Sequence, residues 1–97
     1  MKVIRHAVLR GRVQGVGFRA FVENAAARTG VEGWVRNRGD GTVEAVFAGD
    51  AKAVEDTIAA CRKGPIGALV DGVDVRDGRA EELARRAGDK FAVLPTL

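Results

Sequence analysis

The stretch V-E-G-W-V-R-N-R-G-D-G-T-V-E-A-V-F-A, residues 31–48, decides the fold of this chain. Two strand-like runs, Val31–Asn37 and Thr42–Ala48, flank the connection Arg38–Gly41, which contains two glycines and an aspartate. A short connection of this composition between two such runs is typical of a β-hairpin. The middle of the chain is therefore expected to hold two antiparallel strands.

A strand and a helix are predicted before the hairpin. The apolar residues of Lys2–Arg10 are more continuous than alternating, which favours a central strand in contact with the core. Over Ala20–Thr29 the apolar residues recur at helical spacing, and Gly30 stands where a left-handed helix terminator belongs. The first part of the chain thus predicts the order β-α-β.

A second helix and a fourth strand are predicted after the hairpin. Asp50 is a candidate N-cap for the helix, and the Gly64-Pro65 pair ends it. The run Leu69–Arg76 predicts the strand, in which Gly72 marks a bulge because the apolar positions on its two sides differ in parity.

The last quarter of the chain predicts less structure. The charged segment Asp77–Asp89 is expected to be a surface connection with a helical turn, and Phe91–Leu94 a short edge strand because Pro95 follows. The element order β-α-β-β-α-β predicts a ferredoxin-like fold, an α/β protein of the α+β sandwich type. We expect an antiparallel sheet with two helices on one face and a short C-terminal edge strand, in one domain over residues 1–97.

A glycine-rich loop lies between the first strand and the first helix, in L-R-G-R-V-Q-G-V-G-F-R, residues 9–19. Glycines let successive backbone N–H groups turn inward, and the positive end of a helix dipole points to the same place. Arg12 and Arg19 add fixed positive charge. The loop therefore predicts a site for a small oxyanion, and we expect that oxyanion to be a phosphoryl group.

Two other interpretations of this loop are weaker. Residues 15–20, G-V-G-F-R-A, match a dinucleotide-binding pattern, but that pattern works in a parallel doubly wound sheet. Residues 17–22, G-F-R-A-F-V, faintly echo an RNA-recognition strand, but here the phenylalanines lead into a helix. We discount both.

Two longer segments resemble the signature motifs of the acylphosphatase family. They are G-R-V-Q-G-V-G-F-R at residues 11–19 and G-W-V-R-N-R-G-D-G-T-V at residues 33–43. The resemblance continues through Phe47, Gly49 and Arg62–Pro65, and covers about residues 8–76. The family's fold is the same β-α-β-β-α-β sandwich that the periodicity predicts.

The resemblance implies an enzyme that hydrolyses the carboxyl–phosphate bond of acyl phosphates by in-line attack of a water molecule. It implies two catalytic residues, Arg19 to bind the phosphate and Asn37 to orient the water. It also implies that neither a metal ion, a cofactor nor a covalent intermediate takes part, because a phosphate oxygen can accept the proton. The backbone N–H groups expected to complete the phosphate site belong to Gln14, Gly15, Val16, Gly17, Phe18 and Arg19.

Net charge and residue counts restrict the class of ligand and the cellular location that we expect. The net charge of +3 suits an anionic ligand, and Arg12, Arg36 and Arg38 either steer that ligand or serve solubility. The single cysteine, Cys61, excludes an internal disulfide. Residues 1–6 are not expected to belong to a signal peptide, and no apolar stretch reaches about 20 residues. His6, the only histidine, is expected to be structural. We expect a cytoplasmic monomer with a small acyl phosphate as substrate and with no nucleic-acid or membrane partner.

Two alternatives stay open. One is a binding module that holds RNA or another polyanion on its arginine patch, which a scarcity of displayed aromatic side chains disfavours. The other is a non-catalytic or carbamoyl-phosphate-related acylphosphatase-like domain of the kind found within larger maturation enzymes. The length of 97 residues disfavours the second.

Overall fold

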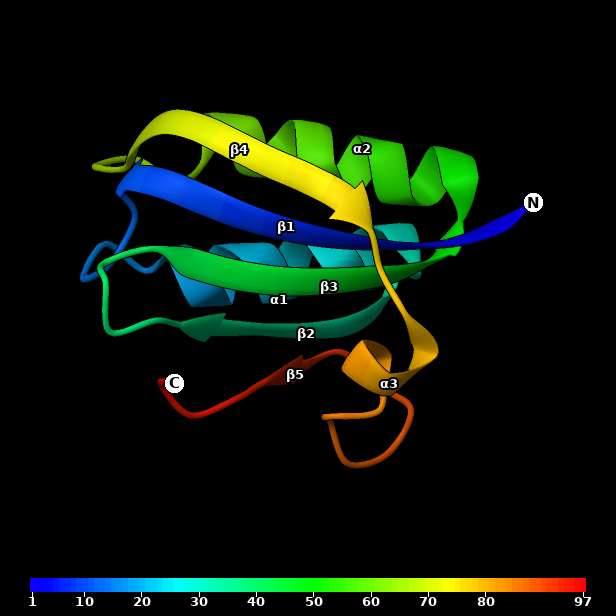
Figure 1. The fold of residues 1–97 in the computed structure, drawn as a ribbon. Coiled ribbons are helices and arrows are strands. Elements are labelled where there is room, and N and C mark those ends of the chain that lie inside the picture. The colour runs from blue at the N-terminus through cyan, green and yellow to red at the C-terminus, as the bar shows by residue number, and fades with distance from the viewer.

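The computed structural model describes residues 1–97 and shows a five-stranded sheet with two long helices and one short helix (Figure 1). The strands lie in the order β4-β1-β3-β2-β5 across the sheet. The strands are β1 (Lys2–Arg12), β2 (Glu32–Asn37), β3 (Val43–Asp50), β4 (Leu69–Asp77) and β5 (Ala92–Val93). The helices are α1 (Phe18–Thr29), α2 (Ala51–Lys63) and α3 (Ala80–Leu83).

The predicted hairpin is formed by β2 and β3, which pair antiparallel and place Asn37 opposite Val43. Its turn is closed by the backbone N–H of Arg38, which donates to the carbonyl of Thr42 at 2.9 Å. The carboxylate of Asp40 accepts from both the backbone N–H and the hydroxyl of Thr42, at 3.0 and 2.6 Å. Asp and Gly are favoured in turns for these reasons, so the local prediction is confirmed.

The predicted central strand, β1, pairs antiparallel with β3 on one side and with β4 on the other. In the β1–β4 pair, Arg10 lies opposite Gly72 and Gly11 opposite Val70, so Asp71 is the additional residue. This register shift is the bulge that was predicted at Gly72.

The sheet is mixed, and the prediction of a wholly antiparallel sheet is wrong at one edge. The short strand β5 pairs parallel with β2, with Trp34 opposite Ala92 and Val35 opposite Val93. The chain leaves β4 and enters β5 at the same end of the sheet, after passing through α3 (Figure 1). Because β5 returns in the direction opposite to β4, it runs in the direction of β2.

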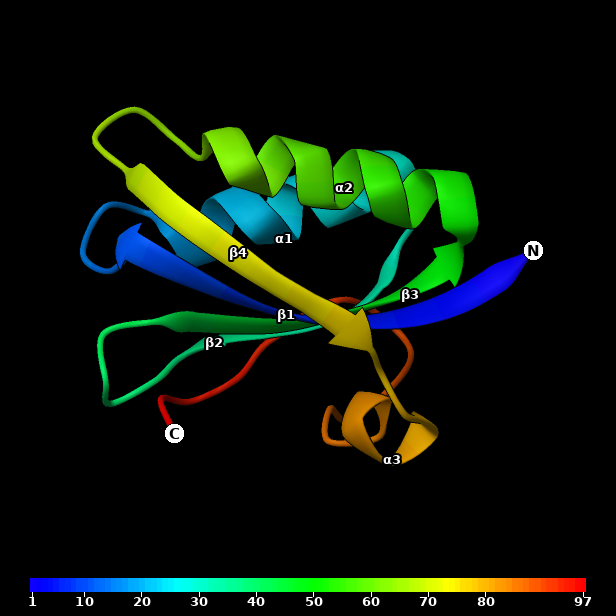
Figure 2. The same ribbon diagram turned by 45° about the horizontal axis from the view of Figure 1, so that its top comes forward.

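The two long helices cover one face of the sheet, and α3 lies on the other face (Figure 2). The main core lies between the sheet and α1 and α2, and it includes Leu9, Phe18, Val22, Val35 and Phe47. The predicted N-cap of α2 is confirmed, since the carboxylate of Asp50 accepts from the N–H of Lys52 at 3.2 Å. None of the helices has the length and apolar character needed to cross a membrane.

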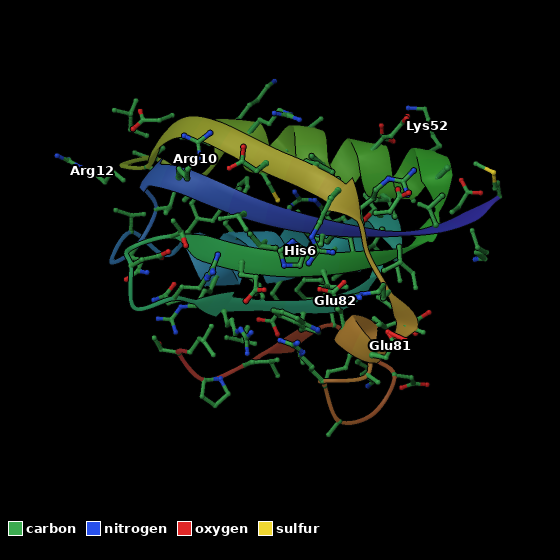
Figure 3. The ribbon with its side chains drawn as sticks, viewed as in Figure 1. His6, Arg10, Arg12, Lys52, Glu81 and Glu82 are labelled. Carbon is green, nitrogen blue, oxygen red and sulfur yellow. The ribbon has the colours of Figure 1, made fainter.

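The opposite face of the sheet holds a buried charged network. Glu44 accepts a hydrogen bond from Arg36 at 2.7 Å and forms another of 2.7 Å with His6. Figure 3 shows His6 and, near it, Glu82 of α3. Burial raises the pKa of Glu44, but the hydrogen bonds with His6 and Arg36 outweigh burial and hold this pKa below its usual value. His6 is therefore a packed structural residue in this arrangement, as predicted.

The helical turn predicted within Asp77–Asp89 is α3, and two contacts hold it on the sheet. The indole N–H of Trp34 donates to the backbone carbonyl of Glu82 at 2.7 Å. The Glu82 carboxylate accepts from the guanidinium of Arg76 at 2.6 and 3.0 Å. This segment was expected to be a surface connection, whereas Glu82 is buried.

Candidate active site

The glycine-rich loop joins the end of β1 to the start of α1, which begins at Phe18 and thus earlier than the predicted Ala20. Gly15 and Gly17 adopt left-handed conformations with φ of 75° and 76°, which side-chain-bearing residues rarely adopt. Gly17 is the N-cap of α1, and no side chain caps the helix. The left-handed glycines turn the chain sharply and bring Arg19 into the first helical turn.

The N–H groups of this loop have few partners within the protein. No N–H group of residues 14–17 donates to a backbone carbonyl. The N–H groups in the first turn of any α-helix also lack an intrahelical acceptor. Free N–H donors at a helix N-terminus are the groups that bind anions in many proteins.

A cavity of about 290 Å³ opens over the start of α1. Four of the six residues predicted to bind phosphate line it, and they are joined by the predicted water-orienting residue, Asn37. Gln14 and Val16 are not among the lining residues. The four lining residues of the predicted cradle are Gly15, Gly17, Phe18 and Arg19.

Arg19 is exposed and forms no ion pair with any carboxylate of the protein. The first turn of α1 contains no acidic residue. A cation at the positive end of a helix dipole is unfavourable by about 0.3–1 kcal/mol. This placement favours an anionic ligand beside Arg19, which would reverse the sign of the local interaction.

Asn37 is the last residue of β2, and it lines the same cavity as Arg19. Its Oδ1 is buried and accepts no hydrogen bond, and it is the sole buried side-chain nitrogen or oxygen atom in this condition. A buried acceptor without a partner costs about 1–3 kcal/mol. Since Asn37 is one of the residues that line the cavity, a small donor such as water is the partner that would suit this oxygen.

The side chain of Gln14 points to the hairpin. Its Nε2 donates to the backbone carbonyls of Arg38 and Thr42, each at 2.8 Å. These bonds tie the glycine-rich loop to the turn that follows Asn37. No local sequence signal indicates this contact, because it depends on how the loop and the hairpin meet in the folded chain.

Sequence reasoning missed four further residues of the cavity, which are Val13, Ala20, Glu23 and Val93. Glu23 lies one helical turn after Arg19, and the spacing i, i+4 places both on one side of α1. That spacing is the signal that could have found Glu23. Val93 comes from β5, and nothing in its local sequence indicates a position in the cavity.

The other chemically notable residues lie elsewhere. Arg36 pairs with Glu44 and stacks at 4.9 Å over the Trp34 ring, on the face of the sheet away from α1 and α2. Burial raises the pKa of the Cys61 thiol to about 12, so the thiol is not a nucleophile near neutral pH. No group of three or more His, Cys, Asp or Glu side chains is arranged to hold a metal ion.

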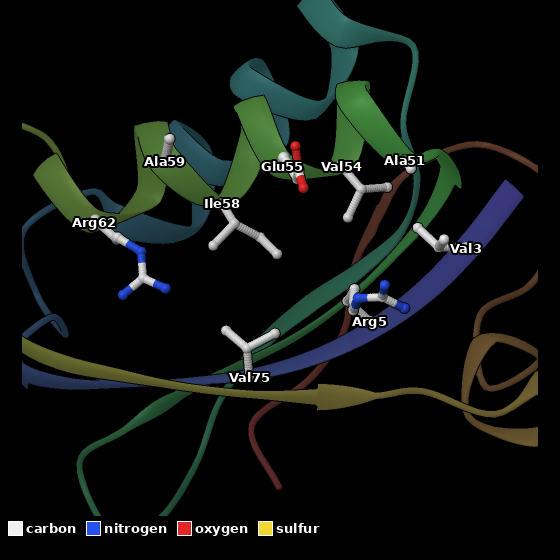
Figure 4. A pocket seen from close by; sticks show the side chains of 9 residues that line it. All are labelled: Val3, Arg5, Ala51, Val54, Glu55, Ile58, Ala59, Arg62 and Val75. Atoms are coloured by element: carbon white, nitrogen blue, oxygen red, sulfur yellow. The ribbon is translucent and has the colours of Figure 1, made fainter. Parts of the chain in front are cut away.

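A second cavity, of about 260 Å³, lies between α2 and the strands β1 and β4 (Figure 4). It contains none of the predicted site residues. Apolar side chains such as Val54, Ile58 and Val75 line most of it, and Arg62 points toward it from α2 (Figure 4). The two predicted catalytic residues, Arg19 and Asn37, line the first cavity and not this one.

The chain is an α+β protein whose first cavity opens over a helix N-terminus, a place that suits a small anion. The sequence model of the family described as "Acylphosphatase" matches residues 5–92. The chain belongs to the acylphosphatase family, whose members are enzymes that hydrolyse acyl phosphates.

Similar proteins support this assignment over almost the whole chain. The chain is 55% identical over 97 residues to an acylphosphatase of Bradyrhizobium diazoefficiens, covering 99% of this chain and 98% of the relative. It is 53% identical over 96 residues to an acylphosphatase of Rhodopseudomonas palustris, covering 98% and 97%. The crystal structure of an acylphosphatase from Bacillus subtilis superposes with a TM-score of 0.83 at 33% identity, covering 97% of this chain and 99% of that one.

A larger protein contains a similar domain. The structure of full-length HypF, in a phosphate- and nucleotide-bound form, matches with a TM-score of 0.84 at 28% identity. The match covers 99% of this chain but only 12% of HypF. The two bacterial acylphosphatases, in contrast, are matched over nearly their full length.

Proposed function

We propose that the enzyme hydrolyses the carboxyl–phosphate bond by direct in-line attack of a water molecule that Asn37 orients and that Arg19 and the glycine-rich loop align with the phosphate. One observation carries this proposal. The Oδ1 of Asn37 is a buried acceptor without a partner, and Asn37 lines the same cavity as Arg19, whose guanidinium forms no ion pair. These are the two groups that the reaction needs.

The loop and Arg19 bind the phosphate and stabilise the transition state. Charge spreads over the equatorial phosphate oxygens as the reaction proceeds. A guanidinium donates two charge-assisted hydrogen bonds to such oxygens, and preorganised N–H groups of Gly15, Gly17, Phe18 and Arg19 supply further donors. We assign the N–H groups of Gln14 and Val16 to the same cradle.

Asn37 orients the nucleophile. Its Oδ1 accepts one O–H of the water, which leaves a lone pair of the water oxygen free to attack phosphorus. The new P–O bond forms from this oxygen while the P–O bond to the acyl group breaks, and the acyl group leaves as a carboxylate. The proton of the attacking water passes to a phosphate oxygen. A carboxylate is a weakly basic leaving group, so no metal ion, cofactor or covalent intermediate is required.

An isotope experiment tests the site of bond cleavage. Single-turnover hydrolysis of benzoyl phosphate in ¹⁸O-water, with EDTA present, should place the label in inorganic phosphate alone. Label in benzoate would show attack at the carbonyl carbon and overturn the proposal. Complete loss of activity with EDTA would overturn its metal-independent form.

The cavity and its surroundings support a small-molecule substrate. None of the aromatic side chains is exposed, so no platform for stacking nucleic-acid bases is displayed.

The unpaired cysteine supports a cytoplasmic location. We also propose that the enzyme acts as a monomer, and we assign the fold to the ferredoxin-like class. The β-α-β-β-α-β order and the two helices on one sheet face support that class.

A further inference from the structure

We propose that Gln14 is a positioning residue that fixes Asn37 relative to the phosphate-binding loop, through its carboxamide rather than its backbone. This inference rests on the proposed function, because it concerns the distance between the phosphate and the water. The side chain of Gln14 does not line the cavity. Any effect of the side chain on the reaction must therefore act through its hydrogen-bond partners.

The carboxamide of Gln14 uses both of its donors on the hairpin. One N–H reaches the carbonyl of Arg38, which directly follows Asn37, and the other reaches the carbonyl of Thr42 on the far side of the turn. Each carbonyl also accepts a backbone bond within the turn, from Gly41 at 3.1 Å and from Arg38 at 2.9 Å. Each of the two carbonyl oxygens therefore accepts two hydrogen bonds, one for each lone pair, and the turn closes around the Gln14 amide.

These two bonds are the hydrogen bonds that connect the loop to the turn. No backbone hydrogen bond joins residues 13–17 to residues 38–42, and no ion pair does so. The left-handed conformations of Gly15 and Gly17 leave the loop without regular structure to hold it in place. The Gln14 amide is therefore the polar clamp between the element that carries Arg19 and the element that carries Asn37.

The consequence for catalysis concerns alignment. In-line attack requires the water to lie within about 3–3.5 Å of phosphorus and opposite the leaving group, and a misplacement of about 1 Å can cost 10²-fold in rate. Phosphate binding depends on the loop and Arg19 alone. Loss of the clamp should therefore lower kcat and leave the affinity for inorganic phosphate unchanged.

The substitution Gln14→Met tests this, since methionine has a similar length and shape but no donor. With benzoyl phosphate we expect kcat to fall about tenfold or more, while the inhibition constant of inorganic phosphate changes by less than about twofold. Thr42→Val is the matched control. It removes the Thr42–Asp40 side-chain bond from the same turn but leaves both Gln14 bonds intact, so kcat should stay near the wild-type value.

A double-mutant cycle with Asn37→Ala separates positioning from a general structural role. In the Asn37→Ala background no water is held, so Gln14→Met should change kcat by less than about twofold. An equal tenfold loss in both backgrounds would overturn the inference, as would a parallel loss of phosphate affinity. If Gln14→Met does not fold, Gln14→Asn serves, because its shorter side chain cannot reach both carbonyls.

The failure of this inference differs from that of the proposed function. Wild-type kcat in Asn37→Ala alone would overturn the water-orienting role and the inference with it. A second outcome would overturn only the inference. In it, Asn37→Ala lowers kcat, and Gln14→Met lowers kcat by the same factor in that variant as in the wild-type enzyme.

Discussion

Arg19 and Asn37 line the same cavity without bonding to one another, although one lies in the first turn of α1 and the other ends β2. The guanidinium has no carboxylate partner, and the Asn37 carbonyl oxygen has no donor. A protein that only needed to be stable would gain from pairing these groups. The proposed function requires this separation, because it leaves one donor group for a phosphate and one acceptor for a water molecule.

Replacing Arg19 should remove most of the activity. We expect Arg19→Ala to lower kcat/KM by at least about 10²–10³-fold, the usual cost of losing one preorganised donor to a developing charge. Inorganic phosphate should also inhibit this variant more weakly. Steady-state kinetics with benzoyl phosphate measures both effects, and Arg28→Ala, at the other end of α1, is the matched control. Turnover near the wild-type rate in Arg19→Ala would contradict the assigned role.

Replacing Asn37 should separate activity from stability. In Asn37→Ala we expect kcat to fall more than KM rises, because orientation of the water matters chiefly in the transition state. The free energy of unfolding should not decrease, because the change removes a buried acceptor that costs about 1–3 kcal/mol.

Urea unfolding and steady-state kinetics on the same samples test this pair of effects. Asn24→Ala, an exposed amide on α1, is the control for both measurements. A variant that is both inactive and strongly destabilised would point to a structural role for Asn37.

Removing the negative charge of Glu23 should strengthen the binding of anions. Two unit charges about 6 Å apart in water interact by about 0.7 kcal/mol, which is roughly a threefold effect. We therefore expect Glu23→Gln to lower the inhibition constant of inorganic phosphate about threefold at low salt. The difference should disappear near 1 M salt, where the Debye length is about 3 Å. Glu55→Gln, on α2 and outside this cavity, is the matched control, and a salt-independent effect would contradict the electrostatic explanation.

The attachment of α3 should weaken in acid. The hydrogen bonds from Arg76 lower the pKa of Glu82 from its usual 4.5 to about 2. A lowered pKa contributes stability that is present above pH 4.5 and is lost as the pH falls through about 2. The free energy of unfolding should therefore decline between these values.

The substitution Glu82→Gln should flatten that decline, whereas Glu81→Gln, on an exposed neighbour, should leave it unchanged. Urea titrations across this pH range measure the difference. An equally steep decline in Glu82→Gln would assign the acid sensitivity to other carboxylates, with Glu44 the first to test.

Local signals predicted most of the fold. The Arg38–Gly41 turn, the Asp50 cap and the Gly72 bulge each depend on residues adjacent in the sequence, and each is found in the structure. The direction of β5 depends on the path of a charged segment around the end of the sheet. Neither periodicity nor turn composition encodes that path, so the parallel pairing with β2 could not be predicted.

In the candidate site, too, features set by adjacent residues were predictable and features set by the folded chain were not. The glycine-rich loop and Arg19 are contiguous, so their association was predictable from one short segment. That Asn37 would lie in the same cavity came from the family resemblance, and its catalytic role stays a prediction. The clamp by Gln14 and the presence of Val93 arise only where separate segments meet in the folded chain.

The attachment of α3 to the sheet provides a built-in optical reporter. Trp34 is the only tryptophan of the chain, and the chain has no tyrosine. Its ring is fully buried and its N–H donates to the backbone of Glu82. Release of the C-terminal segment would expose this indole to water and shift its fluorescence emission to longer wavelength. Undocking of α3 can therefore be followed in unlabelled protein while the rest of the domain stays folded.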